Sequence, residues 1–317
     1  MRTVINVLAA FCLVLLSCLI GMCRAARPAM LPDLESAPSQ AVVSDAGGHP
    51  VPVADYRRIA CISPIAAQVL PDLVASERII MVGAWHDRYS PLAFRTPDRQ
   101  IIESLDSIEV LIAAQPDLVI INHLGISQSV VDQLRAQGLQ VLDLGPMLGF
   151  DSLQASIALL GAVLDQEQRA AALARSLKRR LHQVAAHVGD DQQRRAVYLG
   201  THGGRLMGGT IGSAYHDLLR FAGLIDVAAE AGFTGWPSYS AEDLYRLDPA
   251  VIVTQQDMVE ALRTMPALAG LRALTDRDGL LVLPRHFDPT GPRLLDYCEM
   301  LNDMAYGDLV PDHEAPP

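Results

Sequence analysis

A short motif occurs twice in this chain of 317 residues, and its repetition restricts the possible folds more than any other feature. The copies read SIEVLIAAQPDLVII at residues 107–121 and SAEDLYRLDPAVIVT at residues 240–254, so they start 133 positions apart. Each has a serine, a glutamate two residues later and a proline seven residues after the glutamate, before a mostly apolar run. The pattern predicts a serine-capped helix that leads into a buried strand. A chain with two such units is expected to contain two similar halves.

Strand-like and helix-like segments alternate in both halves, which predicts an α/β fold with parallel sheets. The strands are apolar throughout, as expected of strands covered by helices on both faces. After a small hairpin near residues 42–53, we expect strands near 58–63, 78–84, 117–122 and 140–145 and helices at 65–75, 107–115 and 127–137. In the second half we expect strands near 195–200, 250–254 and 279–284 and helices at 214–222, 240–247, 257–263 and 292–305.

A long helix is predicted between the halves, over residues 165–188, which contain no glycine or proline. Asp165 and Gln168 together suit a capping-box-like start. Apolar residues recur at helical spacing, at Leu173, Leu177, Leu181, Val184 and Val188. At ~1.5 Å per residue such a helix would be about 35 Å long, enough to bridge two lobes. The alternative is an ordinary surface helix of one domain.

The first 26 residues are predicted to be a secretory signal peptide. Arg2 precedes an apolar run from Val4 to Cys23, and small residues and a proline-rich segment follow. A transmembrane anchor is the alternative, because the run is about long enough to span a bilayer. The stretch that ends at Cys18 also resembles a lipoprotein signal. We therefore expect an exported, periplasmic or extracytoplasmic protein, either soluble or lipid-anchored at Cys18, with a flexible tether at 27–41.

Composition argues against several classes of function. The net charge is −11, and an acidic protein lacks the clustered lysine and arginine that sequence-independent nucleic-acid binding requires. Only two of the five cysteines, Cys61 and Cys298, follow the signal region, which is too few for a disulfide framework. Both fall in apolar segments, so we expect buried thiols.

No catalytic signature appears in the sequence. The glycine-rich stretch GTHGGRLMGG, residues 200–209, matches neither the P-loop pattern nor the dinucleotide-binding pattern. Its glycines are expected to let the backbone approach a ligand. No nucleophile and base stand at a suggestive spacing, so the sequence does not predict an enzyme.

The order of the motifs resembles a known family. It runs from the hairpin VSDAGGHPVPV through an RI strand that ends in SP, EVLIAAQPDLVI, the long helix and GWPSYSAEDLYRLDPAVIV to GPRLLDYCEML. This order is similar to the periplasmic substrate-binding proteins of ABC importers for iron chelates, haem and vitamin B12, and the likeness covers residues 42–305. The resemblance implies two lobes, each with a central parallel sheet flanked by helices, joined by one long rigid helix, with the ligand in the cleft between them.

The same resemblance implies a function and partners. The protein would capture a metal chelate, cobalamin, haem or a ferric siderophore, and deliver it as a monomer to an ABC permease and its ATPase in the cytoplasmic membrane. It would need no catalytic cofactor. The expected segments are a signal peptide (1–26), a tether (27–41), an N-terminal lobe (42–150), connecting helices with the long helix (151–189), a C-terminal lobe (190–306) and a disordered tail (307–317).

Loops at the carboxyl ends of the parallel strands are expected to line the cleft. They contain aromatic and polar side chains that suit a large flat ligand. Trp236 stands six residues before Glu242, which resembles the position of a corrinoid-contacting tryptophan in the B12-binding members. The candidate ligand-binding residues are Ser63, Trp85, His86, Tyr89, Asn122, His123, His202, Arg205, Met207, Trp236, Tyr239, His286 and Asp288.

Two further sets of residues have candidate roles. Glu109 and Glu242 are the repeated glutamates; each suits the first turn of a helix for electrostatic reasons alone, and the resemblance implies that they dock onto permease arginines, one per lobe. Four histidines are candidate axial ligands of a bound metal, and surface or hydrogen-bonded histidines are the alternative: His86, His123, His202 and His286. A protein that binds a free transition-metal ion through such histidines is the alternative function.

Overall fold

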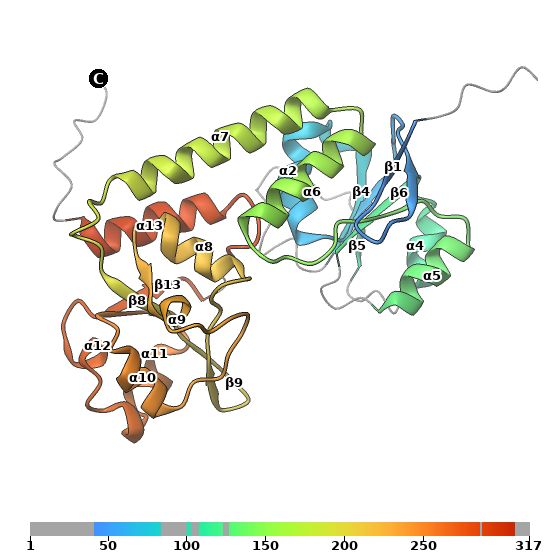
Figure 1. The fold of residues 1–317 in the computed structure, drawn as a ribbon. Coiled ribbons are helices and arrows are strands. Elements are labelled where there is room, and N and C mark those ends of the chain that lie inside the picture. Colours follow the sequence, from blue (N-terminus) through green and yellow to red (C-terminus); the bar gives the residue numbers. More distant parts are fainter. Residues whose placement is uncertain (1–40, 84–99, 103–107, 123–126, 286, 308–317) are drawn as a thin grey trace, which may run out of the picture. The chain divides into compact units, whose positions relative to one another are not determined.

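The computed structural model describes residues 41–83, 100–102, 108–122, 127–285 and 287–307. Over this part of the chain it has two parallel sheets flanked by helices, as predicted (Figure 1). A two-stranded hairpin, β1 (Val42–Ser44) and β2 (Pro50–Pro52), comes first, where the sequence predicts one. Among the described helices none combines the length and the apolar character needed to span a bilayer.

The first half contains a five-stranded parallel sheet with the strand order β5-β4-β3-β6-β7. Every residue of β3, β6 and β7 is buried, because helices cover both faces. The edge strand β5 is not evident in the sequence, since it has three residues and two of them are exposed. The elements are β3 (Ile59–Cys61), α2 (Pro64–Leu73), β4 (Ile79–Gly83), β5 (Gln100–Ile102), α4 (Ile108–Ala114), β6 (Leu118–Ile121), α5 (Gln128–Ala136) and β7 (Val141–Asp143).

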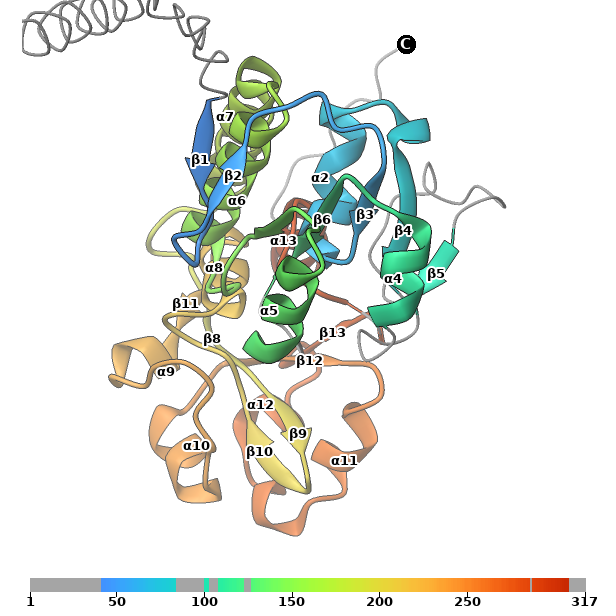
Figure 2. The same ribbon diagram turned by 90° about the vertical axis from the view of Figure 1, so that its right-hand side faces the viewer.

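The second half contains a four-stranded parallel sheet with the strand order β11-β8-β12-β13. A separate hairpin, β9 and β10, extends from it (Figure 2). The elements are β8 (Arg195–Tyr198), β9 (Gly200–His202), β10 (Arg205–Met207), α8 (Ala214–Phe221), β11 (Ile225–Asp226), α9 (Val227–Glu230), α10 (Ala241–Leu247), β12 (Val251–Gln255), α11 (Val259–Arg263), α12 (Arg272–Thr275), β13 (Leu280–Leu283) and α13 (Leu294–Tyr306).

The two sheets share one topology. In each, the first strand of the parallel sheet (β3 or β8) lies between the next strand of that sheet on one side (β4 or β11) and the strand of the repeated motif on the other (β6 or β12). The order of the strands therefore reverses beside β3 and beside β8. Such a reversal opens a crevice at the carboxyl ends of the strands, where ligands of open α/β sheets bind.

The sequence repeat extends to the conformation of the backbone. The helices α4 and α10 are each followed by a residue with positive φ, Gln115 at 47° and Asp248 at 41°. Non-glycine residues rarely adopt this conformation. Each precedes a buried proline, Pro116 or Pro249, and then the strand begins. The two halves thus share the same uncommon turn, and the duplication predicted from the motif is confirmed.

The long helix joins the two halves. Helix α7 (Glu167–Ala186) packs against α6 (Phe150–Val163) and α2 at one end and against α13 and α8 at the other (Figure 1). Leu177, Leu181 and Val184 are buried along its apolar face. One continuous hydrophobic core contains residues of both sheets together with this face. The alternative of a surface helix that belongs to one domain is therefore wrong.

The start of α7 differs from the prediction. Asp165 has a φ of 55° and ends α6 instead of opening α7, because the Gln166 N–H donates back to the carbonyl of Gly161 at 2.7 Å. Gln166 is the N-cap and makes no side-chain capping bond. A Cβ on Gly161 would overlap Ala170 of α7, so glycine is needed where the two helices approach. The capping box predicted at Asp165 and Gln168 is wrong.

The two cysteines of the folded part are buried, as predicted, and form no disulfide. Burial raises the pKa of the Cys298 thiol well above its ordinary value. Cys298 lies in α13 and its sulfur contacts the carbonyl of Leu218 in α8. It acts as an apolar core residue.

A close contact outside α7 also connects the halves. Gln68 of α2 is 4% exposed, and its side-chain oxygen accepts a hydrogen bond from the Arg293 N–H at 3.2 Å. The neighbouring Gly291 presses its backbone against the same amide, so that a Cβ at this position would overlap Gln68. The loop before α13 is thereby seated on the first half.

We predict that Gly291→Ala destabilises the protein by about 1–3 kcal/mol, because the added methyl group displaces the buried Gln68 amide and leaves it and the Arg293 N–H without their hydrogen bond. Gly200→Ala is the matched control, since the nearest atoms to a Cβ there are 3.8 Å away. Urea denaturation followed by circular dichroism measures both changes. Equal stabilities of the two variants would contradict the close contact.

Candidate ligand-binding site

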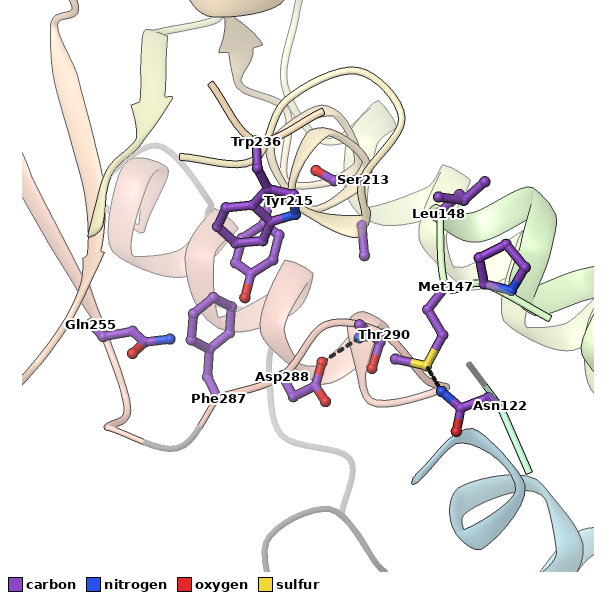
Figure 3. A pocket seen from close by; sticks show the side chains of 12 residues that line it. Asn122, Met147, Leu148, Ser213, Tyr215, Trp236, Gln255, Phe287, Asp288 and Thr290 are labelled. Carbon is purple, nitrogen blue, oxygen red and sulfur yellow. Dashed lines mark hydrogen bonds between the residues drawn. The ribbon is translucent and has the colours of Figure 1, made fainter. Parts of the chain in front are cut away.

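A cavity of about 470 Å³ lies where the carboxyl ends of the strands in both halves meet (Figure 3). The first half contributes the residues that follow β6 and β7, and the second half contributes the start of α8, the Trp236 loop, the end of β12 and the loop before α13. The lining residues are Asn122, Pro146, Met147, Leu148, Ser213, Ala214, Tyr215, Trp236, Gln255, Phe287, Asp288 and Thr290. This is the edge at which the sequence predicts ligand-binding loops.

Aromatic side chains form one wall of the cavity. The ring of Tyr215 lies 4.7 Å from that of Trp236 and 5.6 Å from that of Phe287, centroid to centroid. Tyr198 packs behind Tyr215 at 4.2 Å. Trp236 remains 50% exposed although it is large and apolar. An accessible aromatic surface of this kind suits a flat ligand that can stack on it.

A second cavity, of about 340 Å³, continues past the aromatic wall. It shares Tyr215, Trp236 and Gln255 with the first and is lined further by Met207 of β10 and by Met258. Each cavity has the size of a small-molecule site. The exposed tryptophan therefore borders both cavities.

The local structure that holds Tyr215 involves a buried carboxylate. Asp226 accepts hydrogen bonds from the Thr210 hydroxyl at 2.7 Å and from the first turn of α9, and it pairs with His216 at 2.9 Å. Ser213, the N-cap residue of α8, donates its hydroxyl proton to the carbonyl of Thr210 at 2.8 Å. These bonds fix the turn that starts α8, and Tyr215 follows in its first turn.

The glycine-rich stretch has a role in packing. Gly203 and Gly204 have φ values of 58° and 77° and form the turn between β9 and β10. Gly208 approaches the backbone of Tyr198 so closely that a Cβ would overlap its carbonyl oxygen. Gly203, Gly204 and Gly208 therefore serve a hairpin and a contact with β8, whereas Gly200 lines a cavity beside Tyr198 and Trp236. That this backbone approaches a ligand stays a prediction.

Two carboxamides face the cavity from equivalent positions of the two halves. Asn122 follows β6 and Gln255 ends β12, and they stand 133 positions apart, as the two motifs do. Asn122 is 2% exposed, and its Nδ2 lies 3.1 Å from the sulfur of Met147, a weak acceptor. In Figure 3, Gln255 stands beside the aromatic wall and Asn122 at the opposite side. The repeat thus places one amide on each side of the cavity.

Asp288 is the only carboxylate among the described lining residues. Its side chain accepts a hydrogen bond from the Thr290 N–H at 3.0 Å. Burial raises the pKa of the Asp288 carboxyl above its ordinary value, against the lowering effects of Thr290 and of the Arg293 charge. Tyr198 responds to burial in the same direction: its pKa is raised, so its hydroxyl stays protonated at neutral pH.

The structure brings some of the predicted residues to the cavities and not others. Asn122, Trp236 and Asp288 line the main cavity, and Met207 lines the second. Ser63 is 1% exposed and caps α2 by accepting from the Ala66 N–H. Arg205 is exposed in the β9–β10 hairpin, and Tyr239 is buried against Phe233, 5.3 Å between ring centroids.

Several predicted residues fall outside the described part of the chain. These are Trp85, His86, Tyr89, His123 and His286, and the side chain of His202 also lies outside it. All four candidate axial ligands belong to this set. Among the residues that are described, no three or more histidine, cysteine, aspartate or glutamate side chains group closely enough to hold a metal ion.

Sequence reasoning missed several lining residues, although a signal existed for two of them. Gln255 is the counterpart of Asn122 in the repeat, so the offset that relates the motifs points to it. Phe287 lies next to the predicted residue Asp288, in the loop before α13. Met147 and Thr290 carry no local signal, because their place depends on how the two halves meet.

The repeated glutamates are both exposed in the first turns of short helices. Ser240 caps α10 through a capping box with Asp243, whereas Ser107 lies outside the described residues. Each helix precedes a strand of a parallel sheet, so it begins at the carboxyl edge, the edge that bears the cavity. Glu109 and Glu242 therefore lie one on each half, at the edge where the ligand would enter.

The sequence profile of a family described as periplasmic binding protein matches residues 59–278. The chain belongs to the periplasmic binding protein family. Its matched region includes both copies of the motif, the long helix and Trp236. The members are binding proteins by description, which agrees with the ligand-sized cavity.

Two individual proteins are related to this chain at low sequence identity. An uncharacterised ABC transporter substrate-binding lipoprotein, YvrC of Bacillus subtilis, is 24% identical over 208 residues, which is 64% of this chain and 66% of the relative. A cobalamin-binding protein of Halobacterium salinarum is 26% identical over 201 residues, 62% of this chain and 53% of the relative. The match thus covers slightly less than two thirds of the first relative and about half of the second.

Solved structures share the fold. One from an ABC-type Fe³⁺-hydroxamate transport system of Saccharomonospora viridis is similar with a TM-score of 0.65 at 26% identity. The similarity covers 84% of this chain and 99% of that one. The two-lobed α/β architecture is therefore shared with that solved structure.

We predict that Asp288→Asn raises the thermal midpoint at neutral pH. The folded-state pKa of Asp288 lies above its unfolded value, so the folded protein holds this proton more tightly and loses stability as the pH rises through that interval. The asparagine has no charge to bury, and its oxygen can still accept from Thr290.

Calorimetry of both proteins between pH 3 and pH 7 measures the effect. The thermal midpoint of Asp288→Asn should exceed that of the wild type at pH 7. The difference should disappear toward pH 3, where the wild-type carboxyl is protonated in the folded and in the unfolded state. A gain that does not depend on pH would show that the charge is not its cause.

Proposed function

We propose that this protein is the substrate-binding component of an ABC importer, which captures a metal chelate outside the cytoplasmic membrane and delivers it to the permease. The observation that carries the proposal is the cavity at the shared edge of the two halves, with an exposed aromatic wall and an amide from each half. A site built by two lobes suits a protein that binds and releases its ligand without changing it. The partners would be the permease with its ATPase, and the protein would act as a monomer.

The ligand candidates are cobalamin, haem and a ferric siderophore. The name of the Halobacterium relative supports the first, and that of the Saccharomonospora structure supports a hydroxamate siderophore. Trp236 and Tyr215 offer a stacking surface to a macrocycle. The predicted axial histidines, His86, His123, His202 and His286, would suit haem.

Absorbance and thermal-shift titrations of the purified protein with cyanocobalamin, haemin and ferrichrome test the proposal. We expect one of the three to bind at micromolar concentration or below and to raise the thermal midpoint. Zinc and manganese salts, added alone, test the alternative of a free-metal-ion binder. Tight binding of a bare ion with no response to any chelate would contradict the proposal.

An enzyme on the same scaffold is the other alternative, since one fold hosts many functions. The described lining residues offer no nucleophile paired with a base: the Ser213 hydroxyl donates to the Thr210 carbonyl, and no histidine is among them. We therefore propose that the protein carries its ligand unchanged.

The proposed location is extracytoplasmic. A signal peptide over residues 1–26 and a tether over 27–41 would export the protein, and lipidation at Cys18 would hold it at the membrane surface. The lipoprotein name of the Bacillus relative supports the anchored form. The lobes would then occupy 42–150 and 190–306, with the connecting helices at 151–189 and a tail at 307–317.

We predict that Trp236→Ala weakens binding of the chelate tenfold or more, because stacking and apolar burial by one aromatic residue contribute about 1.5–3 kcal/mol. The fold should tolerate the change, since half of the side chain is exposed. Tyr245→Ala is the control, an aromatic residue of similar exposure in α10 that lines neither cavity. Equal affinities of the two variants in a fluorescence titration would remove Trp236 from the site.

The repeated glutamates would dock onto the permease. We predict that Glu109→Arg combined with Glu242→Arg leaves chelate affinity unchanged and abolishes uptake, because both side chains are exposed and neither lines a cavity. Uptake of labelled chelate by cells that depend on the importer measures the effect.

The matched control is Glu77→Arg combined with Asp278→Arg. This pair makes the same change of charge on exposed residues, one in each half, but the residues precede β4 and β13 and so lie at the opposite edge of the sheets. The control should import normally. Normal uptake by both double variants would refute the docking role.

A further inference from the structure

One corner of the cavity contains three polar side chains whose hydrogen-bonding groups have few good partners within the described part of the protein. Asn122, Asp288 and Thr290 line the cavity there; in Figure 3 Asp288 and Thr290 lie side by side next to Phe287, and Asn122 lies beyond the sulfur of Met147. We call them the polar corner. Asn122 comes from the first half, and the other two come from the loop before α13 of the second half.

The hydrogen-bonding groups of the polar corner are poorly used within the protein. The Asn122 Nδ2 has a thioether sulfur, a weak acceptor, as its partner. The buried Thr290 hydroxyl has no partner at standard hydrogen-bonding distance and angle among the described residues. Its less well aligned hydrogen bond to Asp288 lowers the pKa of that carboxyl. Buried polar atoms are normally paired, so these atoms point to a ligand group that pairs with them.

The charge of the polar corner restricts what that group can be. Asp288 contributes a carboxylate, and none of the described residues that line the cavity is a lysine, arginine or histidine. The positive charge of Arg293 lowers the pKa of Asp288 and so favours its carboxylate form. Arg293 itself is not among the lining residues, and its guanidinium lies 5.3 Å from the centre of the Tyr297 ring. A second carboxylate placed here would meet a like charge in a partly desolvated site.

A primary amide has the complementary pattern. Its N–H groups can donate to the Asp288 carboxylate, and its carbonyl oxygen can accept from the Asn122 amide or the Thr290 hydroxyl. Such a group would satisfy the atoms that the protein leaves without good partners. Rejection of the wrong ligand would come from repulsion at Asp288, which is an effective way to gain specificity.

We infer that the polar corner is a subsite that binds a primary carboxamide on the rim of the chelate and discriminates against a carboxylate at the same place. The inference rests on the proposed function and narrows it to a neutral, amide-bearing chelate. Asp288 is its specificity-determining residue, and Asn122 and Thr290 supply the donors.

The test compares ligands that differ in one rim group. Cyanocobalamin carries primary amides, and each of its isomeric monocarboxylic acids has one carboxylate in place of an amide. Fluorescence titration at pH 7.5 gives the affinity of the wild-type protein for each. We expect cyanocobalamin to bind, and at least one acid isomer to bind tenfold or more weakly.

Variants assign the discrimination to the polar corner. Asp288→Asn should reduce the ratio of the two affinities, cyanocobalamin over that acid isomer, to threefold or less, because asparagine can donate a hydrogen bond to a carboxylate. Thr290→Val, which keeps the shape and removes the hydroxyl, should weaken cyanocobalamin severalfold. Asp257→Asn is the control: this exposed carboxylate lies close enough to raise the pKa of Tyr198 but lines neither cavity, so the ratio should stay at its wild-type value.

The outcomes separate this inference from the proposed function. If all acid isomers bind wild type within threefold of cyanocobalamin, or if Asp288→Asn leaves the ratio unchanged, the subsite is overturned. If haemin or ferrichrome binds and cyanocobalamin does not, the subsite is overturned while the importer function stands. If no chelate binds, the proposed function fails and the subsite fails with it.

Discussion

The packing of α7 against both halves is the constraint on which the rest of the structure depends. Its buried face, with Leu177, Leu181 and Val184, completes one hydrophobic core that includes residues from both sheets. A continuous helix bends little, because bending would break its hydrogen bonds and uncover this core. The two carboxyl edges are consequently held at a set separation, with the cavity between them.

Smaller contacts fix the edges themselves. The Phe150 N–H at the start of α6 donates to Asp217 of α8 at 2.6 Å, and Gly149 leaves room for that carboxylate. Gln68 and Gly291 make a similar contact between α2 of the first half and the loop before α13 of the second half. The aromatic wall and the polar corner are therefore built on supports that cross between the halves. A site prepared in this way loses less entropy when it binds its ligand, so the contacts contribute more to affinity.

The sequence predicts most of the fold because its signals are local. The repeated motif specifies a helix, a turn and a buried strand within fifteen residues, and the structure repeats even the positive φ of Gln115 and Asp248. What it could not predict depends on contacts distant in sequence. Asp165 has the chemistry of an N-cap, yet the close approach of α6 and α7 makes it the end of one helix. The edge strands β5 and β11 have only three and two residues, too few to show the alternation of apolar and polar residues that predicts a strand.

The site divides in the same way. Asn122, Trp236 and Asp288 are polar or aromatic residues after predicted strands, so their place at the cavity follows from α/β topology. Ser63 has an equally suitable place but is used as a helix cap. The same reasoning from the sequence selects Tyr239, which packs into the core of the second half. Residue type and strand end thus select candidates, and only tertiary packing decides which of them reach the ligand.

A crystal structure of the protein with its bound chelate tests the central claim most directly, namely that the two halves bind one ligand between them. The account predicts that the ligand lies against Trp236 and Tyr215 and contacts both Asn122 and Gln255. It also predicts that α7 keeps its contacts with both halves. A ligand that contacts only one half, or that occupies another surface, would contradict the account.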